Sequence, residues 1–66
     1  MKLLDVVALI EDLPEKNLKR GQVGTIVEEL AEGVYEIEFS DLNGVAYAFV
    51  AVQESKLMPL IFEPVA

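Results

Sequence analysis

The fold of this chain follows from residues 20–39, which read RGQVGTIVEELAEGVYEIEF. Two stretches with alternating side chains, 22–30 and 34–39, flank the tripeptide Ala-Glu-Gly at 31–33. A three-residue loop that ends in glycine is typical of a β-hairpin in which a left-handed residue follows a type I turn. The stretch therefore predicts two antiparallel strands joined by this loop.

The length of the loop sets which residues of the two strands face each other. Pairing Leu30 with Val34 places Val27 opposite Ile37, Thr25 opposite Phe39 and Glu29 opposite Tyr35. The face predicted to be buried then carries Val23, Thr25, Val27, Tyr35, Ile37 and Phe39. The alternative is a slip of one residue, which would bury Glu28 and expose Val27 beside Glu38.

Short apolar runs and turn residues predict the other elements. In chain order these are a strand over 5–10, a loop over 11–20, a turn over 40–44, a strand over 45–52, a single helical turn over 53–56 and a closing strand over 57–60. We expect Leu13 and Leu18 to fold back and plug one end of the core. The long loop is therefore interpreted as a lid, with a binding loop as the alternative.

The strand predicted over 45–52 is almost wholly apolar, and both of its sides are expected to be covered. The bulkier side carries Val45, Tyr47, Phe49 and Ala51, and the smaller side carries Ala46, Ala48, Val50 and Val52.

Five short strands, with a long loop after the first and one helical turn before the last, predict an all-β fold. The spacing indicates a small SH3-like barrel that forms a single domain over residues 1–66. The C-terminal tail, residues 61–66, is apolar, and we expect it to pack against another surface.

The composition limits the chemistry that the chain can perform. It has neither Cys nor His, and it has 12 acidic against 5 basic residues, for a formal net charge of -7. Nucleophilic catalysis lacks its usual groups, so we expect no enzyme activity, no catalytic residues, no cofactor and no metal site. The acidic field repels nucleic acid and anionic lipid and favours basic protein partners.

A domain of 66 residues buries too little surface to be stable by a wide margin, so an oligomer or a partner is expected. The N-terminal sequence lacks the apolar core of a signal peptide, and no apolar run is long enough for a membrane span. The sequence therefore predicts a cytoplasmic protein without membrane contact.

The outer face of the predicted hairpin is the candidate binding site. It combines the apolar residues Ile26, Leu30 and Val34 with the acidic residues Glu28, Glu36 and Glu38. Glu28 opposite Glu36 is a like-charge pair that a cationic partner would relieve. Three ways of covering this face stay open, namely a second copy of the chain, the C-terminal tail and a foreign protein.

A basic cluster on the long loop gives an alternative from another class. Lys16, Lys19 and Arg20 could contact nucleic acid, with Tyr35 or Tyr47 as a surface on which a base stacks. The favoured interpretation is that these cations neutralise the acidic residues of the same loop.

The sequence also resembles a known family. The blocks Glu-Asp-Leu-Pro at 11–14 and Leu-Lys-Arg-Gly at 18–21, with Gly-Thr-Ile-Val-Glu at 24–28, are similar to an uncharacterised bacterial family of short acidic domains. The resemblance implies an SH3-like barrel and no known activity. It also suggests an antitoxin or immunity role, so we expect a non-enzymatic protein-binding module that docks a basic partner.

Overall fold

The computed structural model describes residues 1–65 and is built from short strands. The elements are β1 (Val6–Leu9), the 3-10 turn η1 (Pro14–Lys16), β2 (Val23–Ala31), β3 (Val34–Ser40), β4 (Ala46–Gln53), the 3-10 turn η2 (Glu54–Lys56) and β5 (Leu57–Pro59). The predicted all-β class, the long first loop and the single turn before the last strand are confirmed. Ala66, the last residue of the predicted tail, lies outside the described residues.

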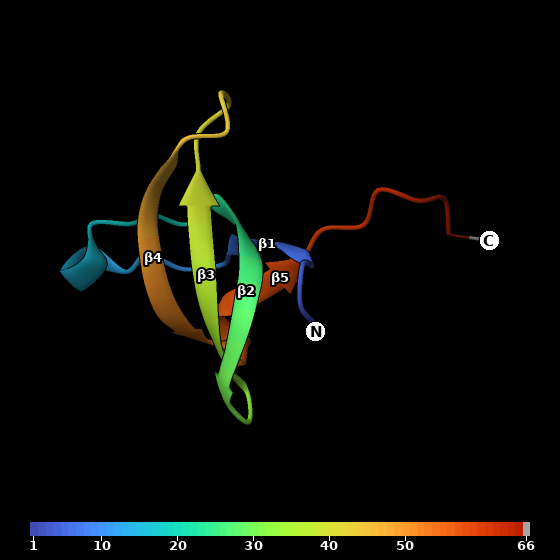
Figure 1. Cartoon of the computed structure of the whole chain (residues 1–66), viewed down its shortest axis with the longest axis horizontal. Helices are drawn as coiled ribbons and strands as arrows, with labels where there is room; N and C mark the ends of the chain where they lie inside the picture. Colours follow the sequence, from blue (N-terminus) through green and yellow to red (C-terminus); the bar gives the residue numbers. More distant parts are fainter. Residues whose placement is uncertain (66) are drawn as a thin grey trace.

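All five strands belong to one antiparallel sheet with the order β4-β3-β2-β1-β5. The sheet curls, so that β2, β3 and β4 form a front layer with β1 and β5 behind it (Figure 1). It is not closed as a barrel, because β4 and β5 stand at its two ends and no ladder joins them within residues 1–65. The short β5 ends at Pro59, whose nitrogen cannot donate a ladder hydrogen bond.

The core lies between the two layers, and the first loop closes it. The backbones of Leu13 and Leu18 bond to each other in both directions, at N···O distances of 2.9 and 3.1 Å. Both leucine side chains are buried in the same cluster as Ile37 and Phe39. The prediction that these leucines plug the core is confirmed.

The pairing of β2 with β3 differs from the predicted register. Glu29 does face Tyr35, but Ile26 rather than Val27 faces Ile37, because a bulge interrupts the ladder between Ile26 and Glu28. Val27 is the extra residue of β2, and the pairing shifts by one position at this point. Ile26 is therefore directed inward, while Glu28 stays on the outside.

The bulge corrects the predicted burial of β2. Ile26 is fully buried, whereas Val23 is 41% exposed and Thr25 and Val27 are only half-buried. The prediction that Ile26 lies on the outer face is therefore wrong, and so is the prediction that Val23, Thr25 and Val27 form the core. On β3 the inward face is as predicted, since Tyr35, Ile37 and Phe39 are all buried.

A second irregularity adjoins the hairpin turn. Ala31 pairs with Val34, so the loop is one residue shorter than predicted, and the shift lies between Glu29 and Ala31. Gly33 has the predicted left-handed conformation, with φ of 73°. Leu30 is the extra residue, and it is 46% exposed.

The strand β4 is covered on one side only, which corrects the prediction that both of its sides are covered. Val52 is buried, and Ala46, Ala48 and Val50 are half-buried, so the smaller side chains face the core. The bulkier set, Val45, Tyr47, Phe49 and Ala51, is exposed. Small residues fit the inner side because Ile37 and Phe39 on the neighbouring strand already fill that space.

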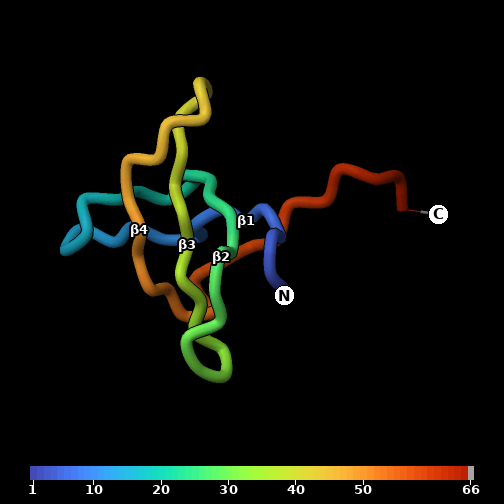
Figure 2. The backbone as a smooth tube through the Cα atoms, in the orientation of Figure 1, coloured from blue at the N-terminus to red at the C-terminus, as the bar shows by residue number. Residues whose placement is uncertain are grey.

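The described part of the C-terminal tail does not pack on the sheet of its own chain, so it does not cover the outer face; packing of the tail on another chain stays a prediction. It leaves the end of β5 and runs away from the body of the molecule (Figure 2). Ile61, Phe62 and Val65 are exposed, Phe62 by 79%. Among the described residues, no helix has the length and apolar character that crossing a membrane requires.

Candidate functional site

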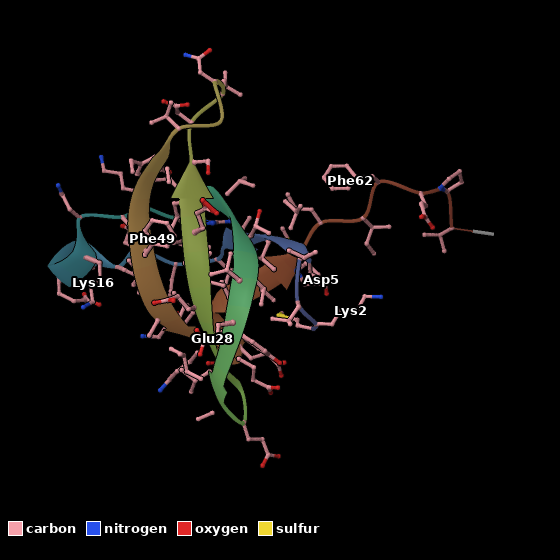
Figure 3. All side chains as sticks on the ribbon, in the orientation of Figure 1. Lys2, Asp5, Lys16, Glu28, Phe49 and Phe62 are labelled. Carbon is pink, nitrogen blue, oxygen red and sulfur yellow. The ribbon has the colours of Figure 1, made fainter. Side chains whose placement is uncertain are left out.

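The outer face of β2, β3 and β4 carries the candidate site. Two cross-strand rows follow from the ladders, with Glu28, Glu36 and Ala51 side by side in one, and Thr25, Glu38 and Phe49 in the other. Figure 3 labels Glu28 on β2 and Phe49 on β4, on either side of β3. We define the outer face as Thr25, Glu28, Val34, Glu36, Glu38, Phe49 and Ala51.

Three carboxylates are concentrated on this outer face. Glu28 and Glu36 face each other across the β2–β3 ladder, and Glu38 follows on the same side of β3 at about 7 Å by the strand repeat. Within residues 1–65 the single ion pair joins Lys56 Nζ to Glu11 Oε1 at 3.7 Å, far along the chain from these glutamates. Their mutual repulsion is therefore not balanced by a contacting cation of the described chain.

Exposed apolar surface accompanies these carboxylates, but only part of it lies where the sequence predicted it. Ile26 is absent because it is buried, and Val34 is half-buried. Phe49, which lies beside Glu38, is 61% exposed, and Leu30 at the hairpin end is also exposed. The result is a surface that mixes carboxylates with an aromatic ring.

The basic cluster of the first loop forms no ion pair with these carboxylates within residues 1–65. Lys16, Lys19 and Arg20 are exposed. The backbone N–H of Arg20 donates to Asp12 Oδ1 at 2.8 Å, so this acid holds the loop backbone, while Glu11 pairs with Lys56. Tyr47, one of the two predicted stacking residues, accepts a hydrogen bond from Gln22 Nε2 at 3.1 Å. The nucleic-acid role stays a prediction.

Sequence reasoning missed a polar cluster around Tyr35, for which the one available signal is the general need of a buried tyrosine for a hydroxyl partner. The ring is buried, and its hydroxyl reaches the edge of the core, where it donates to Glu54 Oε1 at 3.2 Å. The carbonyl oxygen of Met1 lies 3.4 Å away. Burial raises the pKa of the Tyr35 hydroxyl above its ordinary value of 10.0, and the charge of Glu54 raises it further.

This environment predicts how Tyr35 titrates. In the folded protein the hydroxyl keeps its proton at a pH where the unfolded chain has lost it. The associated stability is complete below pH 10 and is lost as the pH rises through the unfolded and then the folded pKa. Ultraviolet absorbance of tyrosinate in a Tyr47→Phe background measures the midpoint, and we expect Glu54→Gln to move it toward the ordinary value. An unchanged midpoint in that variant would show that Glu54 does not act on Tyr35.

The described residues offer no enclosed site. Residues 1–65 contain no pocket, and they bring together no group of three or more His, Cys, Asp or Glu side chains suited to a metal ion. The candidate site is therefore an open surface.

Comparison with known families places this surface inside a recognised domain. The family model described as Domain of unknown function (DUF4926) matches residues 3–59. The chain belongs to this family. The matched region of the DUF4926 domain contains all five strands and every residue of the outer face, whereas the tail beyond Pro59 lies outside it. No curated protein and no solved structure matched the chain.

Membership in the DUF4926 family confirms that part of the predicted resemblance which concerned a domain of unknown function. Bacterial origin, an acidic character of the whole family and its SH3-like nature stay predictions.

Proposed function

We propose that this chain is a non-catalytic protein-binding module that docks a basic protein on its outer face. One observation carries the proposal, namely that Glu28 and Glu36 face each other, with Glu38 on the same side, and have no cation in contact within residues 1–65. A lysine or arginine from a partner would remove this repulsion.

The two components of the face would contribute differently to binding. A pair of like charges across a ladder destabilises a sheet by about 0.2–1 kcal/mol, so relief of the repulsion alone gives little affinity. Burying the ring of Phe49 would contribute about 1.5–3 kcal/mol. The charges therefore set the association rate and the orientation of the partner, and the aromatic contact sets its dissociation rate.

The family resemblance supports a narrower form of the proposal. An SH3-like module with an acidic outer face fits an antitoxin or immunity protein whose basic, toxin-like partner is encoded nearby. The absence of Cys and His from the sequence supports a role without catalysis.

A matched pair of variants tests the docking face. The triple variant Glu28→Gln, Glu36→Gln, Glu38→Gln removes three charges from the outer face. Its control, Glu15→Gln, Glu32→Gln, Glu63→Gln, removes three exposed charges elsewhere. Each tagged protein is used at low salt for affinity purification from the native host.

The native sequence and the control are expected to retain a basic protein in a stoichiometric amount, and the outer-face variant at least tenfold less, since several charge-assisted contacts are lost. Recovery of self-associated chain alone, or equal losses in both triple variants, would contradict docking on this face.

A further inference from the structure

The strand β4 ends the sheet with an unpaired edge. Its ladder partner is β3, and no backbone group of residues 46–53 bonds to a segment other than β3 within the described residues. The first loop, which passes behind β4 in Figure 1, makes no backbone hydrogen bond with the strand. Backbone donors and acceptors along this edge therefore face outward.

The residues that present these groups can be identified from the ladder. The N–H of Glu54 donates to the carbonyl oxygen of Gly33 at 2.8 Å, next to the pair formed by Gln53 and Val34. Hydrogen-bonded and non-hydrogen-bonded pairs alternate along an antiparallel ladder. Phe49, Ala51 and Gln53 consequently direct their own N–H and C=O groups away from β3, toward the open edge.

The two ends of the sheet are protected to very different degrees. Proteins usually blunt an edge strand by shortness, proline or charge. The strand β5 has three residues and contains Pro59. In contrast, β4 has eight residues, and the stretch 45–52 contains neither proline nor a charged side chain.

We propose that β4 pairs antiparallel with β4 of a second copy of the chain, so that the two five-stranded sheets join across a twofold axis near Val50. An open edge accepts an extended strand, because only such a strand matches its spacing of donors and acceptors. The remaining question is which strand fits.

A second copy fits the charge and the sequence of this edge. Two chains that each carry a net charge of -7 repel each other, and they can approach most closely through segments that carry no charge. The stretch 45–52 is such a segment. Antiparallel pairing about Val50 places Phe49 of each copy opposite Ala51 of the other, which sets a large side chain against a small one.

This inference does not depend on the proposed function. The joined sheet would carry two outer faces, one from each copy, and their glutamates would remain accessible to a basic partner. A dimer would also supply the extra burial that a domain of this size needs.

Proline substitution at the edge tests the pairing with little disturbance of the fold. Gln53 has φ of -69°, close to the angle that proline requires, and its N–H faces outward, so Gln53→Pro removes an edge donor and leaves the β3–β4 ladder intact. Ala51→Pro removes a second outward donor nearer the proposed axis. A chain that ends at Leu60 serves as the control, because it lacks the exposed apolar tail and keeps the β4 edge.

Analytical ultracentrifugation gives the mass of each protein, and circular dichroism shows that each is folded. The native chain is expected to have twice the 7.3 kDa mass of the single chain, and the tail-less control twice the mass of its own shorter chain. Each proline substitution is present in both copies of a twofold dimer, so it removes two hydrogen-bond donors from the shared edge. We therefore expect each proline variant to weaken dimerisation at least tenfold.

Amide hydrogen exchange of the native chain provides a readout that needs no substitution. In the dimer the N–H groups of Phe49, Ala51 and Gln53 are expected to exchange more slowly at high than at low protein concentration. A native chain that stays monomeric, a dimer lost only on removal of the tail, or exchange at these amides that does not depend on concentration would each overturn the proposal.

Discussion

Replacing Ile26 with alanine is expected to lower the free energy of unfolding by about 2–5 kcal/mol, the range for large aliphatic residues in a core. Ile26 is fully buried opposite Ile37 in the core cluster, so its loss leaves a cavity. Val27→Ala is expected to cost only about 1 kcal/mol, since the bulge leaves Val27 half-buried. Urea unfolding followed by circular dichroism measures both values.

The comparison of these neighbours tests the bulge itself. Without it, the hairpin register would bury Val27 and expose Ile26, and the order of the two losses would be reversed. A larger loss for Val27→Ala than for Ile26→Ala would therefore show that the regular register is the one that forms.

A second large effect is expected at Gly24, which lies opposite Phe39 on the inner side of the sheet. A Cβ atom at this position would lie 2.5 Å from Ile37 Cγ2 and 2.8 Å from the carbonyl oxygen of Glu38. The second contact is with backbone, which cannot turn aside as a side chain can. Gly24→Ala is therefore expected to cost about 1–3 kcal/mol, as measured by thermal or urea unfolding.

Gly44 provides the control for this substitution. It has φ of 79° and open space around its Cα, so Gly44→Ala introduces backbone strain of about 1–2 kcal/mol without a steric contact. Gly24→Val distinguishes steric contact from backbone strain, because a larger side chain makes the steric contact worse. A Gly24→Val variant as stable as the native protein would contradict the close packing of β2 against β3.

The order of the elements could be predicted because each boundary has a local chemical cause. Glycine at 33 takes the left-handed conformation that ends the hairpin loop, and Pro14 begins a single turn in the first loop. Leu13 and Leu18 are apolar residues in an otherwise polar loop, which is a reliable sign that they fold back onto the core. Such signals depend on neighbouring residues and need no knowledge of the tertiary structure.

The inward face of β2 could not be predicted, because Ile26 and Val27 are adjacent and equally suited to a strand interior. Alternation alone cannot decide which of two neighbouring apolar residues is buried. The bulged ladder decides it, since it places Gly24 opposite Phe39 and thereby directs Ile26, two positions on, to the same inner side.

The candidate site could be predicted only in part. Glu28, Glu36 and Glu38 lie on the outer face as expected, because carboxylates are costly to bury and keep their side of the sheet on both sides of the bulge. The exposure of Phe49 was missed, since β4 is apolar on both sides and its sequence does not show which side faces water.

Zero-length coupling of carboxylates to amines in the captured complex, followed by mass spectrometry, is a direct test of docking on the outer face, because it links only side chains that are in contact. If the partner docks there, links are expected from Glu28, Glu36 and Glu38 to lysines of the partner. Links confined to the acids of the first loop or to Glu63 of the tail would show that the partner binds elsewhere and that the outer face is not the docking surface.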